Sequence, residues 1–363
     1  MRALLSLVLA AAVFTPPVRA QGADPHPTVT VGTATAKRGE RVYGTLTIPS
    51  ATDSGTTIQL AIVNGAKPGP VVAFISGSHG TEYTSVVAMT RLIARIDPAK
   101  LRGTAIVVPL LNVASFERMV PHVNPVDGKG MNASYPGDAS GTQTQRVLAA
   151  VAREIVAQSD VVVDLHGGDL DEDLRPYSYW IRTGKAARDS ASRALALAFG
   201  LDMIIVNDVD VTSAAGTRTL SGYALSQGKT TFVAEAGHSG LVTPAETAML
   251  VNGSLGVLGA LKMIDHPSKP AAKISWVGAD QRVRADGGGM FYATAARGSV
   301  VKKGQKVGYV TDYVGRPAGD VLAPQDGVVS FIRGVPSLWK GATMVTILRQ
   351  FPGGPAAWQK PER

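Results

Sequence analysis

Residues 71–93 read VVAFISGSHGTEYTSVVAMTRLI, and this stretch decides the fold. Its apolar start is typical of a strand buried on both faces, because no polar residue interrupts it. A turn of small residues follows, and apolar residues then return at helical spacing, with Thr81 expected at the N-cap and Glu82 in the first turn. Strand, turn and helix would bring His79 and Glu82 to the carboxyl edge of a sheet, where open α/β sheets bind ligands.

A second apolar strand ends in the same way, because residues 160–168 read DVVVDLHGG. A single histidine at a strand end is more often a core or surface residue than a ligand. Here two such histidines and a carboxylate, His79, Glu82 and His166, match the His₂Glu set of catalytic zinc hydrolases. Asp164 lies on the same side of its strand as His166, so it could fix the tautomer of that imidazole, although simple surface exposure is an equal alternative.

A third strand, at residues 230–234, is followed by Glu235, which we predict to be the catalytic base facing the metal-activated water. The neighbouring acid Glu246 has a structural explanation. Thr243 and Glu246 form a capping box with Pro244 at the first helical position. The remaining histidines compete weakly as ligands, but His122 and His238 stay candidates for lining the site.

The length and composition indicate a protein with a large core, and the N-terminus indicates export. The chain has 363 residues, 45% of them hydrophobic, and no cysteine, which excludes disulfides and thiolate ligands. Residues 1–20 are typical of a secretory signal peptide, too short for a permanent anchor, so we expect a soluble periplasmic or secreted protein with no transmembrane segment after cleavage. The formal charge of +8 is scattered along the chain, which disfavours nucleic-acid binding.

Shifts in composition divide the rest of the chain. Residues 21–41 are predicted to be a flexible N-terminus, 42–268 a catalytic α/β domain, 274–350 a small all-β domain, and 351–363 a disordered tail. The long segment 110–141 is irregular and rich in polar residues, as functional loops are. The acidic segment 169–175 is expected to be a solvated rim rather than a second metal site.

Several motifs together resemble the succinylglutamate desuccinylase/aspartoacylase family, relatives of the zinc carboxypeptidases. They are GSHGTE at 77–82, PVDGKGMNASYPG at 125–137, DLH at 164–166 and EAG at 235–237, with VKKGQ at 301–305 and APQDGV at 323–328. The resemblance implies an α/β fold with a mixed sheet flanked by helices and a barrel-like C-terminal domain. It also implies one Zn²⁺ held by His79, Glu82 and His166, with Glu235 as general acid/base.

One departure from the family concerns substrate binding. Where the family usually has Asn-Arg, this chain has Asn132-Ala133, and the lost arginine would have held a substrate carboxylate. Asn132 is kept as a substrate-binding candidate, and Arg118 and Arg146 are near enough in sequence to replace the missing cation.

The predicted function is therefore a zinc-dependent hydrolase of the deacylase type, cleaving an amide or, less favoured, an ester of a small molecule or peptide. One alternative is a carboxypeptidase-like peptidase acting on peptides or envelope amides. Another is a non-catalytic metal- or ligand-binding protein on the same scaffold, which the alanine at 133 favours. The sequence has no signature of oligomeric state.

Overall fold

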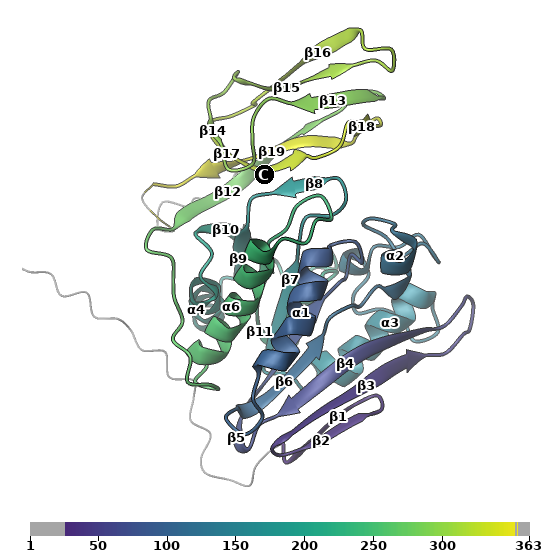
Figure 1. Ribbon diagram of the computed structural model, residues 1–363, viewed down its shortest axis with the longest axis vertical. Helices are drawn as coiled ribbons and strands as arrows, with labels where there is room; N and C mark the ends of the chain where they lie inside the picture. Colours follow the sequence, from purple (N-terminus) through teal and green to yellow (C-terminus); the bar gives the residue numbers. More distant parts are fainter. Residues whose placement is uncertain (1–25, 353, 355–363) are drawn as a thin grey trace, which may run out of the picture.

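The computed structural model describes residues 26–352 and 354, and its framework is a mixed sheet of 13 strands (Figure 1). The catalytic part of this sheet contains, in spatial order, β10 (Met203–Asp208), β9 (Tyr177–Arg182), β11 (Thr230–Glu235), β7 (Val161–His166), β5 (Lys67–Ser76), β6 (Arg102–Val108), β4 (Thr56–Asn64) and β3 (Glu40–Ile48). Strands β11, β7, β5 and β6 are mutually parallel, so their carboxyl ends meet at one edge. The predicted α/β class with a mixed sheet is confirmed.

Helices cover both faces of this sheet because its central strands are apolar on both sides. Val72 and Phe74 of β5 face one core, and Val71, Ala73 and Ile75 face the other. The first core is covered by α1 (Tyr83–Arg95), α4 (Ala186–Phe199) and α6 (Pro244–Ala260). The second is covered by α3 (Gln143–Val151), its π-helical continuation η2 (Ala152–Val156) and α5 (Leu220–Ser226). Among the described helices, none is long and apolar enough to cross a membrane.

The prediction of a flexible N-terminus over 21–41 is wrong from Thr28 onward. Strands β1 (Thr28–Val31) and β2 (Ala34–Lys37) form an antiparallel hairpin, and the chain continues directly into β3. Alternate residues of the hairpin are buried in the second core: Val29, Val31, Ala34 and Ala36. The two prolines just before the hairpin concealed this alternation. The expected signal peptide and residues 21–25 lie outside the described residues.

The C-terminal strands extend the large sheet and add a second one, as the predicted all-β domain requires (Figure 1). The large sheet continues through β12 (Ser275–Arg284), β19 (Thr343–Gln350), β17 (Gly327–Arg333) and β14 (Val300–Val301). The second sheet contains β16 (Pro317–Leu322), β15 (Lys306–Thr311), β13 (Gly289–Ala293) and β18 (Ser337–Leu338). In the segment predicted to be a disordered tail, the Phe351 backbone N–H donates a hydrogen bond to the Trp276 carbonyl. Residues 353 and 355–363 lie outside the described residues.

Two segments that connect strands of the catalytic sheet contain short elements of their own. The predicted irregular segment 110–141 contains α2 (Val113–Arg118) and the single turn η1 (Met131–Ala133). Strand β8 (Glu172–Leu174) follows His166 in the chain and pairs with β17 of the C-terminal domain, with Glu172 opposite Arg333. A segment adjoining the catalytic sheet edge is thus held by the C-terminal domain.

Candidate metal centre

The loop after β5 turns two side chains toward each other. Glu82, not Thr81, occupies the N-cap position of α1, with φ −78° and ψ 61° and no capping hydrogen bond from its side chain. Thr81 instead donates its hydroxyl to the Asp169 carboxylate, so its predicted capping role is wrong. Because the Glu82 carboxylate is not used as a cap, it is available to His79, whose Nδ1 lies 2.7 Å from Oε1.

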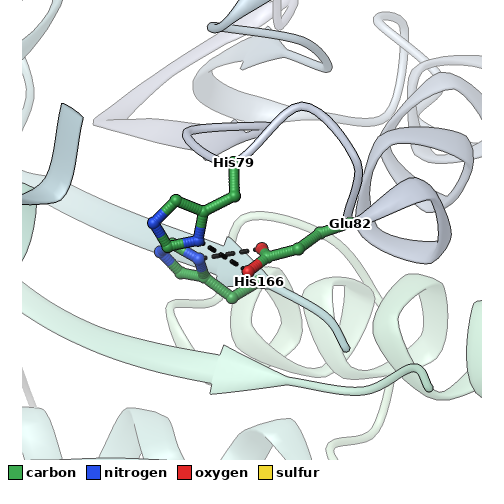
Figure 2. Close-up of side chains that lie close together, drawn as sticks. All are labelled: His79, Glu82 and His166. Carbon is green, nitrogen blue, oxygen red and sulfur yellow. Dashed lines mark hydrogen bonds and ion pairs between the residues drawn. The ribbon is translucent and has the colours of Figure 1, made fainter. Parts of the chain in front are cut away.

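His166, at the end of β7, completes the group (Figure 2). Its Nδ1 lies 2.9 Å from Glu82 Oε2, and the His79 and His166 ring centroids are 5.1 Å apart. One nitrogen from each imidazole and one carboxylate oxygen all lie within 4.8 Å of one another. Burial alone would raise the pKa of Glu82, but the two imidazoles lower it to about 2. Two nitrogens and an anionic oxygen converging on one point are the donor set that a divalent metal such as zinc takes.

The other nitrogen of His166 faces polar groups that orient the ring. Asp164 Oδ1 lies 3.0 Å from His166 Nε2, and the Asn132 amide nitrogen lies 2.8 Å from the same atom. The Asn132 amide nitrogen can only donate, so Nε2 accepts from it in this arrangement and the ring proton is on Nδ1, facing Glu82. A metal bound at Nδ1 would displace that proton. Asn132, predicted to contact substrate, thus lies against a candidate ligand and also accepts a hydrogen bond from the Leu220 amide.

Glu235 ends β11 directly opposite His166 on the neighbouring parallel strand, so the two side chains emerge on the same face. The Tyr177 hydroxyl donates to Glu235 Oε2 over 2.8 Å. Burial raises the pKa of Glu235 to about 7, with a further increase from Glu82, while His166 and Tyr177 oppose the rise. A carboxylate with this pKa can both accept and donate a proton near neutrality.

The two predicted substrate arginines lie in different surroundings. Arg146 is buried, and its guanidinium binds Asp53 Oδ1 at 2.8 Å and the Gly141 carbonyl at 2.7 Å. These contacts give Arg146 a structural role, because they occupy its guanidinium group. Arg118 is exposed at the last turn of α2.

The acidic segment 169–175 is not the solvated rim that the sequence suggested. Asp169 is fully buried, Asp171 is 9% exposed, and both bind His122. The His122 Nδ1 lies 3.2 Å from Asp169 Oδ2, and its Nε2 lies 3.0 Å from Asp171 Oδ1. The His122 ring is in edge contact with His79, with centroids 6.2 Å apart. The sequence shows only an acidic run shortly after a strand-end histidine, and no local pattern pairs this run with His122 or predicts its burial.

His238, the other histidine that the sequence left as a candidate for lining the site, is part of a structural network. Its Nδ1 lies 2.9 Å from Glu246 Oε2, and Glu246 also binds Arg297 of the C-terminal domain. The Thr243 hydroxyl oxygen accepts a hydrogen bond from the Glu246 backbone N–H over 3.2 Å, which is one half of the predicted capping box. The Glu246 carboxylate accepts from the Thr243 hydroxyl rather than from the Thr243 backbone. Glu246 is therefore structural.

Comparison with known proteins shows several that are similar to this chain. The N-alpha-acetyl-L-2,4-diaminobutyric acid deacetylase of Halomonas elongata is 27% identical over 316 residues, covering 84% of this chain and 90% of that protein. The product-bound structure of the ectoine utilization protein EutE (DoeB) from Ruegeria pomeroyi has a TM-score of 0.80 at 22% identity, covering 89% of this chain and 99% of that chain.

A succinylglutamate desuccinylase/aspartoacylase structure from Rhodobacter sphaeroides has a TM-score of 0.76 at 24% identity, covering 86% of this chain and 95% of the other. These structures share the fold. Residues 68–261, more than half of the chain, match the profile described as the succinylglutamate desuccinylase/aspartoacylase catalytic domain. The protein therefore belongs to the succinylglutamate desuccinylase/aspartoacylase family.

Proposed function

We propose that this protein is a zinc-dependent deacylase that hydrolyses the amide bond of a small N-acylated amine. The convergence of His79, Glu82 and His166, with Glu235 emerging beside His166, carries this proposal. These three residues would hold the zinc ion. Zinc bound there would polarise an acyl carbonyl and make a water more acidic.

The protein side chains would move the protons. Glu235, with its raised pKa, accepts a proton from the attacking water and returns it to the leaving amine nitrogen. Tyr177 holds the Glu235 carboxylate through its hydroxyl, and Asn132, with Asp164 beside it, holds the His166 ring with Nδ1 toward Glu82. The amine leaves as a neutral group because it receives this proton before the C–N bond breaks.

The charges near the site support an N-acyl substrate that also carries an amino group. Burial raises the pKa of Glu172 to about 8, repulsion from Glu82 and Glu235 adds to the rise, and His122 opposes it. A substrate ammonium group would relieve this repulsion. The similar Halomonas elongata protein is named for a diamino acid substrate. A carboxypeptidase-like activity has less support, because Ala133 replaces the expected arginine and Arg146 is bound to Asp53.

Export is part of the proposal. The apolar segment after Arg2 and the small residues before Gln21 support a signal peptide that directs the protein to the periplasm or the medium. N-terminal sequencing of the protein recovered from the periplasmic fraction or the culture medium tests this, with Gln21 as the expected first residue. A mature chain that still begins at Met1 would contradict it.

Metal content and hydrolysis, measured on the same preparation, test the proposed chemistry. We expect one zinc per chain and release of acetate from N-acetylated diamino compounds, with weaker activity on N-acetylaspartate, N-succinylglutamate, dipeptides and simple esters. Removal of the metal should abolish turnover, and added zinc should restore it. Bound zinc without turnover of any amide or ester would favour the binding-protein alternative.

A further inference from the structure

A chain of buried contacts connects the C-terminal domain to the candidate metal centre. Arg333, at the end of β17, is 5% exposed and donates from Nη1 to Asp171 Oδ2 over 2.7 Å. The other oxygen of Asp171 lies 3.0 Å from His122 Nε2. His122 in turn is in edge contact with the candidate ligand His79. Three contacts therefore connect a C-terminal strand to the metal centre.

The structure holds Arg333 firmly. Its Nε donates to the Thr343 carbonyl over 2.9 Å, and its guanidinium lies 4.7 Å from the centre of the Trp339 ring. The backbones add to this, since Gly334 donates its N–H to the Asp171 carbonyl over 3.0 Å. A buried arginine with all these contacts fixes the Asp171 carboxylate in one orientation.

His122 is held in an unusual conformation. Its φ of 65° lies in the left-handed region, which residues other than glycine seldom adopt, and such strain concentrates at functional sites. Both ring nitrogens face carboxylates, yet the side chain is still 42% exposed. The imidazole is therefore fixed in position while part of its surface remains exposed to solvent.

A second cation site is the competing explanation. His122, Asp171 and Glu172 are close enough to share an ion. However, the Arg333 guanidinium already neutralises Asp171, so an ion held there would compete with a buried cation 2.7 Å from one of its ligands. The contacts therefore describe a network of ion pairs that positions an imidazole.

We propose that Arg333 is a positioning residue of the active site: through Asp171 it holds His122 where the imidazole contacts the acyl group of the bound substrate. This inference rests on the proposed deacylase function. It makes the C-terminal domain necessary for substrate placement, although that domain supplies none of the proposed metal ligands.

Steady-state kinetics of the zinc-loaded full chain test the proposal. Arg333→Met should lower kcat/KM about 10- to 100-fold, as is typical when the support of a site residue is lost. Arg333→Lys should recover part of this loss. Arg297→Met is the matched control, because Arg297 also joins the C-terminal domain to the catalytic domain, through Glu246 and Asp173, but does not touch Asp171. It should leave kcat/KM near the wild-type value.

A double-mutant cycle separates positioning from general stability. If Arg333 acts through His122, then Arg333→Met should cause no further loss in a His122→Ala background. Losses that add, or an equal loss in Arg297→Met, would overturn the proposal. If Arg333→Met does not fold, the nearly isosteric Asp171→Asn replaces it in the same cycle.

The imidazole signals of protein labelled with ¹⁵N-histidine give a readout without turnover. Acetate, the product expected from N-acetyl substrates, should shift the His122 signal in the wild type and in Arg297→Met but not in Arg333→Met, while His266 serves as a remote control. An acetate shift that survives Arg333→Met overturns the proposal. The expected shifts in a protein that hydrolyses no substrate would support the positioning role and refute the proposed function.

Discussion

At the scale of single residues, the candidate site depends on which nitrogen of each histidine ring faces which carboxylate. His166 presents Nδ1 to Glu82 and Nε2 to Asp164, so one imidazole connects the candidate metal ligand Glu82 to a second buried carboxylate. Glu82 accepts from two imidazoles because its position at the helix start leaves its carboxylate free of capping. Side-chain direction, more than residue type, makes these residues a site.

Glu235→Gln separates binding of the metal from turnover. The amide cannot take a proton from water, so we expect kcat to fall about 10²- to 10⁴-fold while zinc content is unchanged. Metal analysis and acetate release check this. Glu246→Gln is the matched control, because Glu246 serves the helix start and the Arg297 contact, and its variant should keep activity. Near-normal turnover in Glu235→Gln would refute the assignment.

The pH dependence follows from the raised pKa of Glu235. The base acts when ionised, and its pKa is about 7, so kcat/KM should fall as the pH drops below neutrality. The Tyr177 hydroxyl stabilises the ionised carboxylate, so Tyr177→Phe should move this acidic limb to higher pH. Rate profiles of both proteins between pH 5 and pH 9 check the shift. A limb that moves to lower pH would contradict the role given to Tyr177.

At the scale of elements, each proposed catalytic side chain lies at or just after a strand end. His79 follows β5, His166 ends β7 and Glu235 ends β11, and the parallel pairing of these strands brings the three ends together. The N-terminal hairpin lies far from this edge in sequence but closes the second core beside β3 and β4. It is part of the fold, not a loose extension.

The turn of this hairpin supplies a test of its contribution. Gly32 has a φ of 54°, and a Cβ there would lie 2.1 Å from the Thr45 carbonyl oxygen. Gly39 also has a positive φ, 81°, but a Cβ there would meet nothing within 4 Å. Gly39→Ala should therefore lower the free energy of unfolding by about 1–2 kcal/mol through backbone strain alone, and Gly32→Ala by clearly more. Urea unfolding checks the order, and equal losses would mean that the hairpin does not pack as described.

At the scale of the whole molecule, the metal would link distant parts of the chain. Its proposed ligands come from the loop before α1 and from the end of β7. Glu82 and His166 are 84 residues apart along the chain. A ligand that binds only the folded protein stabilises it by mass action. Metal binding and global stability should therefore change together.

Thermal unfolding with and without zinc tests this linkage. At free zinc 1,000 times its Kd, the folded state should gain about 4 kcal/mol, which raises Tm measurably. His79→Ala should lose this zinc-dependent gain because it removes one of three ligands. His266→Ala, on a histidine far from the site in sequence, should keep it. A zinc-dependent rise of the same size in His79→Ala would exclude His79 as a ligand.

The sequence alone determined the features that depend on local patterns. Apolar runs predicted the central strands, helical spacing predicted the helices, and strand-end residues pointed to His79, Glu82, His166 and Glu235. Parallel strands put such ends at one edge, so a local pattern was enough to suggest a common site.

The tertiary structure alone decided the contacts between distant segments. Arg333 and Asp171 are 162 residues apart, and Arg146 and Asp53 are 93 apart, so neither ion pair has a signature in any short stretch of sequence. The same holds for the burial of the acidic segment, since a run of carboxylates is read as solvated until a distant cation is placed against it. Local sequence encodes the conformation of a segment. The partner of a buried charge depends instead on which remote segments pack against it, because a charge needs an opposite charge only where burial removes it from water.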